Sequence, residues 1–399
     1  MRCAACAIYM WSITPCPTDL RNCTPCSPHW PRTASGTTST ALVCTTGIHS
    51  QVCRRRPWTC NSISMPSVRS WKDGLRPLVH RLRRVRDRTL GGACAVLLYH
   101  RVVDIPTDPQ QLAVKPAHFD AHLAVLKQRY RVLTVEEFDH HLLGRKRFPK
   151  GAVLLTFDDG YADNHHAARP LLEKHGMQAL FYIASGYIGS GREYWWDELE
   201  RLLLVNEPLP KELDFAMDGL RIRWSAMDGD VARQARIAYE DRSAVLRAMP
   251  SAVRDAILAE LRAHLGSRVH RGTHLPMTVQ ELEAFASSRA VVIGAHTQWH
   301  PSLAQVDPAE QEAEIHGSKR DLEAMLGRPV RYFSYPFGTG ADFNRTTARI
   351  AREAGFLHTA ANYSGFVHAR SPVHHFPRFL VRDWDGPEFA QRMDTFLHG

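Results

Sequence analysis

The segment 153–161, which reads VLLTFDDGY, constrains this chain more than any other. It begins as a short apolar run, which is typical of a strand buried on both faces. It ends in two adjacent carboxylates, Asp158 and Asp159, followed by Gly160. Two acids side by side at the end of such a strand repel each other unless a cation or a shared proton compensates their charge. The segment therefore predicts either a metal site, with the second carboxylate left as a base, or a solvated Asp-Asp-Gly turn.

A second polar cluster follows another apolar run, AVVI at residues 290–293. Two imidazoles, His296 and His300, lie four residues apart just after this run. We expect them on one side of a helical turn, a spacing that lets both bind one metal. Histidine has 22 copies here, so the pair alone fits two surface histidines equally well. Combined with the two acids, however, it predicts a ligand set of two His and one Asp beside a spare carboxylate.

Apolar runs alternate with helical patterns along most of the chain after residue 92, which predicts a parallel α/β architecture. Both polar clusters then lie at carboxyl ends of strands, where α/β barrels carry their chemistry. Residues 192–288 break this alternation, and we expect them to form a mostly helical insertion. Within it, the pair Trp195-Trp196 predicts either packing or a platform for a sugar ring. The strands are expected at 94–99, 130–133, 153–155, 179–183, 290–293, 331–335, 356–360 and 379–382.

The net charge of +9 is unevenly distributed. Residues 1–92 hold 14 Lys and Arg against 3 Asp and Glu, whereas the remaining residues hold 36 against 38. The basic excess therefore says little about the partners of the main domain. No motif and no aromatic-basic pattern indicates nucleic-acid binding, so no nucleic-acid partner is expected.

Eight of the nine cysteines lie at or before Cys60. Two Cys-x-x-Cys pairs, which begin at Cys3 and Cys23, have the spacing of a zinc ribbon. The surrounding Thr, Ser, Pro and Arg residues lack periodicity, which favours disorder over a folded module. We expect residues 1–64 to be a disordered leader or no part of the working protein, with Met65 as the natural start.

The segment 65–92 is rich in arginine, and it predicts either a solvated leader or a basic helix that touches acidic lipid. The sequence contains no run of about 20 apolar residues of the kind that spans a membrane. It also lacks the uninterrupted apolar region of a signal peptide. We therefore expect a cytoplasmic protein, with contact at the inner membrane surface as an option.

Three motifs, in this order along the chain, resemble those of the polysaccharide deacetylases, the NodB-homology carbohydrate esterases of family 4. They are TFDDG at 156–160, HTxxH at 296–300 and YPFG at 335–338. The resemblance covers roughly residues 93–396, interrupted by the insertion. It implies a distorted (β/α) barrel and a hydrolase that removes acetyl groups from an N-acetylated sugar or polysaccharide. The start of the main domain, Leu98-Tyr99-His100, and the Tyr-Pro-x-Gly form of the third motif are similar to the poly-N-acetylglucosamine deacetylase branch.

The resemblance also implies roles for individual residues. One divalent metal, with zinc expected, would be held by Asp159, His296 and His300, while Asp158 would be the general base. A backbone N–H in the turn formed by Tyr335, Pro336, Phe337 and Gly338 would stabilise the oxyanion.

This chain departs from the family pattern at two places. Many members carry an Arg where this chain has Ser334, so we name Arg378 as the candidate that tunes Asp158. The late His motif that supplies the acid is also absent, and His100 is the best replacement because it follows the first strand of the barrel. His374 and His375 are alternatives, and His100 itself could simply be a strand-end histidine with a local partner.

Two other functions are compatible with the same motifs. The site could hydrolyse O-acetyl groups or another amide, or the barrel could bind glycan without catalysis. The expected partner in every case is a glycan, and the oligomeric state is not predicted.

Overall fold

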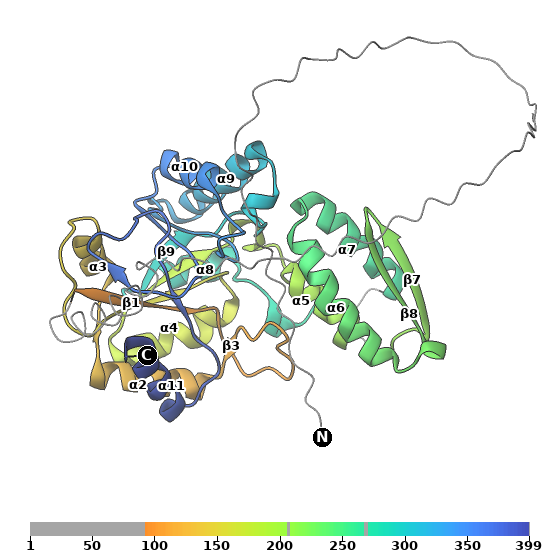
Figure 1. The fold of residues 1–399 in the computed structure, drawn as a ribbon, viewed down its shortest axis with the longest axis horizontal. Coiled ribbons are helices and arrows are strands. Elements are labelled where there is room, and N and C mark those ends of the chain that lie inside the picture. Colours follow the sequence, from red (N-terminus) through yellow and green to blue (C-terminus); the bar gives the residue numbers. More distant parts are fainter. Residues whose placement is uncertain (1–91, 206–207, 267–269, 399) are drawn as a thin grey trace, which may run out of the picture. The chain divides into compact units, whose positions relative to one another are not determined.

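The computed structural model describes residues 92–205, 208–266 and 270–398 (Figure 1). The predictions for residues 1–91, including the zinc-ribbon spacing and the basic helix, lie outside the described residues. Within the described part of the chain, no helix is both long and apolar enough to cross a membrane.

A curled sheet of nine strands forms the centre of the described residues. Its main path runs β11-β10-β9-β6-β5-β1-β12, and every pair on this path is parallel except β1 with β12. β4 pairs with β5, and β13 pairs with β1. The mainly parallel α/β architecture predicted from the alternating pattern is therefore confirmed. The strands are β1 (Ala93–Tyr99), β4 (Arg131–Val132), β5 (Ala152–Phe157), β6 (Ala179–Ile183), β9 (Val291–Ala295), β10 (Tyr332–Ser334), β11 (His358–Ala360), β12 (Val367–His368) and β13 (Phe379–Leu380).

The two edges of the sheet come together at one segment late in the chain. Phe376 forms a parallel bridge with Ala360 of β11, and β13 pairs with Leu97 and Leu98 of β1. This segment brings the first strand beside the last ones. The result is the distorted barrel that the sequence predicts.

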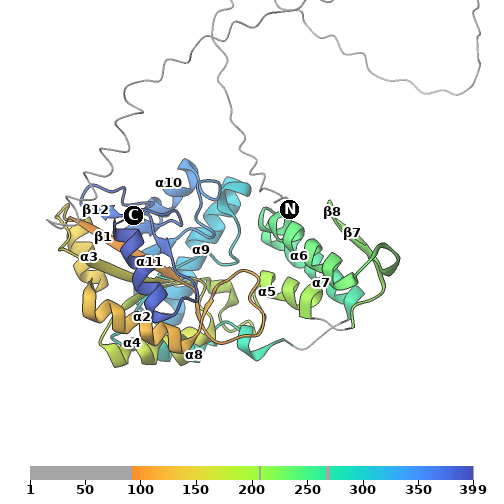
Figure 2. The ribbon, with the colours of Figure 1, turned by 60° about the horizontal axis from the view of Figure 1, so that its bottom comes forward.

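Helices cover the outer face of the sheet (Figures 1 and 2). Because neighbouring side chains on a strand point to opposite faces, Leu97 of β1 packs in a core with α2, α4, α8, α9, α10 and α11, whereas Val96 packs on the other face in a second core, to which α3 contributes. Helix α3 begins with a capping box, in which the Thr134 and Glu137 side chains each accept a hydrogen bond from the other residue's backbone N–H. The helices are α2 (Pro116–Arg129), α3 (Val135–Leu142), the π-helix η1 (Asn164–Ala168), α4 (Arg169–His175), α8 (Val279–Ala286), α9 (Pro308–Leu326), α10 (Arg345–Glu353) and α11 (Gly386–His398). A short parallel pair, β2 (Arg101–Val102) with β3 (Ala113–Val114), lies between β1 and α2 in the chain.

Most of the chain between β6 and α8 forms a lobe beside the barrel, coloured mainly green in Figures 1 and 2. It has an apolar core of its own, to which Trp196, Trp224 and Tyr239 contribute. Helices predominate, but the lobe also contains a β-hairpin that the sequence analysis did not predict. The elements are α5 (Trp195–Glu200), the π-helix η3 (Arg201–Val205), β7 (Glu212–Met217), β8 (Leu220–Ser225), α6 (Val231–Arg247) and α7 (Ser251–Leu265).

A local signal for this hairpin is present in the sequence. Buried and exposed residues alternate along both β7 and β8, and the connection is Asp218-Gly219. Both of these residues have positive φ, at 46° and 79°, which is the conformation that an Asp-Gly turn of a hairpin requires. The sequence analysis missed it because residues 192–288 were interpreted as a mostly helical insertion.

Candidate functional site

The two carboxylates follow β5 through a backbone turn that few residues tolerate. Asp159 has φ 77° and Gly160 has φ 100°, both in the left-handed region. A Cβ atom on Gly160 would lie 3.0 Å from the side chain of Ile183, so the close approach to β6 also favours glycine. The turn leaves both carboxylates buried, with Asp158 3% and Asp159 2% exposed. The solvated turn considered from the sequence is therefore ruled out.

His296 and His300 follow β9 and come together as predicted, with ring centroids 4.8 Å apart. The predicted helical turn is wrong, however, because the chain from 296 to 300 is not helical. Thr297 and His300 instead have positive φ, 65° and 56°. Non-glycine residues in this region are strained, so the surrounding structure must hold the loop in place.

Glu314 of α9 supplies much of that restraint. Its Oε2 atom accepts hydrogen bonds from the backbone N–H of Gln298 at 2.8 Å and of Trp299 at 2.9 Å. The Thr297 hydroxyl accepts a third bond, from the His300 N–H at 3.0 Å. The loop that carries both imidazoles is thus tied to a helix of the barrel.

Asp159, His296 and His300 form a buried group that could hold a metal ion. The Asp159 Oδ1 atom lies 3.7 Å from His296 Nε2 and 3.5 Å from His300 Nε2, and it has no hydrogen-bond partner. The Nδ1–H of His296 donates to the Ser334 carbonyl at 2.7 Å, which leaves the Nε2 lone pair facing Asp159. Burial and the neighbouring Asp158 charge raise the pKa of Asp159, so a cation among these atoms would relieve a real electrostatic cost.

Asp158 is held by the arginine that the sequence analysis named. Arg378 is fully buried, and its Nη1 and Nη2 atoms donate to the two oxygens of Asp158 at 2.7 Å each. Its Nη2 also donates to the Ser334 hydroxyl at 2.7 Å. Burial alone would raise the pKa of Asp158, but the Arg378 guanidinium, together with the neighbouring His296 and His100, holds that pKa below its ordinary value. Asp158 is therefore an ionised, oriented carboxylate.

His100 lies beside this constellation and lines the same cavity. Burial lowers the pKa of His100 to about 3, against the opposing effect of the Asp158 charge. The imidazole is therefore neutral near pH 7. The alternative residues lie elsewhere, since the His374 carbonyl accepts a bond from Tyr335 and His375 contacts Tyr363.

Comparison with known proteins agrees with this geometry. A family model described as Polysaccharide deacetylase matches residues 145–205 and 264–358, which include the Asp pair and both histidines. The barrel is a polysaccharide deacetylase domain. The family predicted from the three motifs is thereby confirmed, and the gap between the two matched segments contains the hairpin and α6 of the insertion.

Individual relatives are more distant. A Bacillus subtilis protein, YxkH, whose name carries a provisional assignment as a polysaccharide deacetylase, is 36% identical over 95 residues. The match covers 24% of this chain and 33% of that protein. Among solved structures, the chain is similar to the Streptococcus pyogenes deacetylase PplD, solved in complex with acetate, at 19% identity and a TM-score of 0.48, over 75% of this chain and 98% of PplD. It is also similar to IcaB from Ammonifex degensii, at 20% identity and a TM-score of 0.49, over 77% of this chain and 98% of IcaB.

The side chains of the third motif of the deacetylase domain lie in two places, the apolar core and the cavity. The Tyr335 side chain is buried away from the metal ligands, with its hydroxyl donating to the His374 carbonyl at 2.8 Å. Phe337, with φ 58°, reaches the cavity, and its ring centroid lies 4.6 Å from that of His300. The N–H of Tyr335 donates to Ala360 and that of Gly338 to Pro336. Among the described residues, the Phe337 N–H has no such acceptor.

The cavity above the site has a volume of about 500 Å³ and is bounded partly by the insertion. Trp195 and Trp196 of α5 line it, and α6 contributes Tyr239 and Arg247. Arg247 bonds to Asp342 and lies 3.9 Å above the Phe337 ring, so α6 is anchored to the barrel. The sequence analysis missed the α6 residues because no motif marks them. The same cavity is lined by Gln110, Ser243, Thr339, Asn362 and Arg382.

The restraint by Glu314 leads to a prediction about metal affinity. Glu314→Gln removes the charge that accepts two backbone N–H groups, so the strained loop relaxes and His300 leaves its position. We expect the apparent metal dissociation constant to rise about tenfold or more, as for other residues that orient ligands. Chelator competition measures it, with Glu312→Gln, an exposed residue of the same helix, as the matched control. Equal affinities in the two variants would show that Glu314 does not position the ligands.

Proposed function

We propose that this protein is a metal-dependent deacetylase of an N-acetylated glycan, which releases acetate and leaves a free amino sugar. The observation that carries the proposal is the buried arrangement of Asp158, Asp159, His296 and His300 in a cavity of a polysaccharide deacetylase domain. Asp158, the acid that is not part of the ligand group, is ionised and adjacent to it.

The donor set fits the expected metal. The orphaned Asp159 Oδ1 and the free Nε2 lone pair of His296 are the atoms that a divalent cation would bind, with His300 as third ligand. A bound zinc ion would polarise the acetyl carbonyl and lower the pKa of the attacking water. The three protein ligands leave positions open for that water and the substrate.

The base in this proposal is Asp158, which takes a proton from the attacking water. Arg378 grips both of its oxygens, so the carboxylate keeps its charge and its orientation as substrate arrives. Ser334 stands where many family members carry an arginine, and Arg378 reaches the same carboxylate from a different part of the chain. In this proposal Arg378 takes the place of the arginine that the third motif lacks.

The turn of the third motif would stabilise the oxyanion through the Phe337 N–H, because the neighbouring N–H groups already have acceptors. Aromatic rings around it, Trp195, Trp196 and Phe337 itself, offer flat apolar surface against a sugar ring. The polar groups of α6 lie at the other side of the cavity. We infer that the insertion selects which glycan enters.

His100 would donate the proton to the departing amine. Because its imidazole is neutral in the free protein, it cannot begin as the acid. It must first receive a proton during the reaction, and the proton that Asp158 takes from water is the available source. His100 and Asp158 line the same cavity, and each charge affects the pKa of the other.

The proposal predicts different outcomes for the two acids. Asp158→Asn should keep the metal yet lower acetate release by about 10²–10⁴-fold, since it removes only the base. Asp159→Asn should lose the metal and the activity together. Acetate release from N-acetylglucosamine oligosaccharides, with and without chelator, and metal content per chain are the measurements.

The same assay separates the alternatives. An O-acetyl ester cleaved while the N-acetyl oligosaccharide is untouched would point to an O-deacetylase. Binding of the oligosaccharide without acetate release from either compound would contradict the enzymatic proposal and favour a glycan-binding barrel.

The Arg378 contact predicts a change in pH dependence. The guanidinium lowers the pKa of Asp158, so the base stays ionised well into the acid range. Arg378→Gln raises that pKa, and the loss of activity on acidification should begin at a higher pH. Arg378→Lys keeps a positive charge and is the control, with the smaller displacement expected. A pH–rate profile whose acid limb is unmoved in the Gln variant would show that Arg378 does not tune the base.

His100→Ala tests the acid separately. We expect about 10²-fold or greater loss of acetate release with unchanged metal content, because proton donation is lost while the ligands stay. Substrates with a better leaving group need less proton donation, so an activated anilide should be cleaved at a nearly normal rate by the variant. An equal loss on both substrates would assign His100 a structural role at the end of β1.

A further inference from the structure

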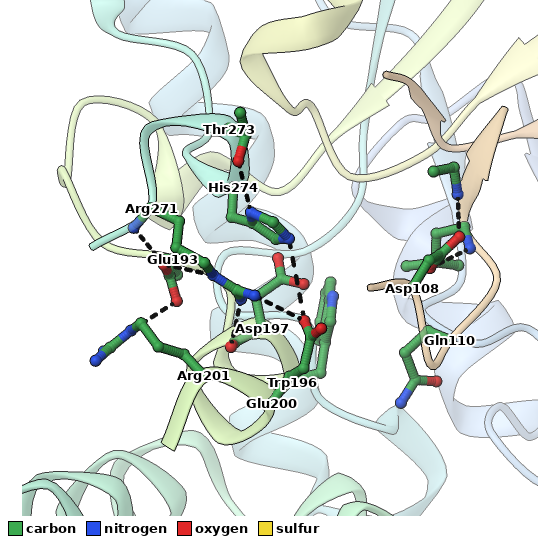
Figure 3. Close-up of polar contacts among 12 residues, drawn as sticks. Asp108, Gln110, Glu193, Trp196, Asp197, Glu200, Arg201, Arg271, Thr273 and His274 are labelled. Carbon is green, nitrogen blue, oxygen red and sulfur yellow. Dashed lines mark hydrogen bonds and ion pairs between the residues drawn. The ribbon is translucent and has the colours of Figure 1, made fainter. Parts of the chain in front are cut away.

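A second buried group of metal-ligating side chains lies where the insertion meets the return segment to α8 (Figure 3). Asp197 and Glu200 belong to α5, and His274 ends the 3-10 helix η5 (Gly272–His274). One ligand atom from each residue lies within 4.8 Å of the other two. Glu200 and His274 are each only 2% exposed, so bulk water does not satisfy them.

Two buried acceptor atoms of this group have no donor. His274 Nε2 lies 4.0 Å from Glu200 Oε2, too far for a hydrogen bond, and neither His274 Nε2 nor Glu200 Oε1 has any partner. The His274 Nδ1 atom lies 2.9 Å from the Thr273 hydroxyl, which can accept a hydrogen bond from the Nδ1–H; in that tautomer Nε2 carries a bare lone pair. Placing two hydrogen-bond acceptors opposite each other in a buried site costs free energy unless a proton or a cation lies between them.

The charges around the group are also unbalanced. Among the described residues, three arginines pair with three buried carboxylates of the insertion: Arg201 and Arg271 bond to Glu193, Arg262 bonds to Glu198, and Arg271 bonds to Glu200 through Oε2 only. Arg101, which lies nearby, is paired with Asp163. None of these arginines forms an ion pair with Asp197, the fourth carboxylate, which is only 6% exposed. Arg271 occupies one oxygen of Glu200 and leaves the other free.

We propose that Asp197, Glu200 and His274 bind a second divalent cation, which joins α5 of the insertion to the segment that returns to the barrel. One imidazole and two carboxylates suit a first-row metal such as Mn²⁺ or Zn²⁺. The role is structural and goes beyond the proposed function. Asp197 also accepts a hydrogen bond from the Tyr161 hydroxyl at 2.7 Å, which in turn accepts one from Trp196 Nε1 at 2.8 Å. The cation would therefore stiffen the aromatic wall of the cavity.

The test uses the full chain with the first site disabled by His296→Ala and His300→Ala. Mn²⁺ is the probe, because the cysteines of residues 1–60 bind it weakly compared with zinc. We expect about one Mn²⁺ per chain by electron paramagnetic resonance, and a rise of a few degrees in melting temperature at saturating metal. Adding Glu200→Gln should abolish both effects, whereas Glu260→Gln, an exposed residue of α7, should change neither.

His274→Ala is the second variant, in case Glu200→Gln disturbs folding. It removes a neutral ligand and no ion pair, and it should also abolish Mn²⁺ binding. Absence of Mn²⁺ from the doubly disabled chain, or binding that persists in both Glu200→Gln and His274→Ala, would overturn the second site. Such a result, with chelator-sensitive acetate release intact in the unaltered protein, leaves the proposed function standing. Full acetate release by the His296→Ala, His300→Ala chain would instead overturn the proposed function alone.

Discussion

The site depends above all on the burial of two adjacent carboxylates at the end of β5. Both are shielded from water, so each needs its own compensation. Asp158 has Arg378, which donates to both of its oxygens, while Asp159 faces two neutral imidazoles and keeps an oxygen without a partner. In the proposed reaction this asymmetry would let Asp158 act as an ionised base and Asp159 as a metal ligand, although the two residues are chemically identical and consecutive in the chain.

The remaining parts of the barrel hold that asymmetry in place. The parallel sheet brings the ends of β5 and β9 to the same rim, and β13 returns beside β1 immediately after Arg378. Ser334 contributes twice, since its carbonyl fixes the His296 tautomer and its hydroxyl accepts from Arg378. Strain at Thr297 and His300 is tolerated because Glu314 and the Thr297 hydroxyl restrain the loop.

The insertion changes what the barrel can accommodate. Its α5 and α6 helices line one side of the cavity, and Arg247 ties α6 to Asp342 of the barrel. The same lobe carries the unbalanced group of buried charges around Asp197 and Glu200. A cation there would link the packing of the lobe to the shape of the cavity, because Tyr161 lies between the Asp197 carboxylate and the Trp196 ring.

Local patterns and motifs were enough to predict most strands of the central sheet, the barrel, the family and the group formed by Asp159, His296 and His300. Each of these rests on short-range regularities: apolar runs of strand length, acids or imidazoles directly after them, and fixed motif spacing. The shape of the HxxxH loop could not be predicted, since its non-helical backbone depends on Glu314, which accepts bonds from residues 15 and 16 positions away. The hairpin was missed because residues 192–288 were interpreted as a mostly helical insertion, although their alternation and the Asp-Gly turn are present in the sequence. Arg378 was named as the partner of Asp158 only because the family resemblance left that role open at Ser334; the bidentate contact itself, over 220 residues, and the wall formed by α6 arise from tertiary packing, since no local pattern encodes contacts over such a separation.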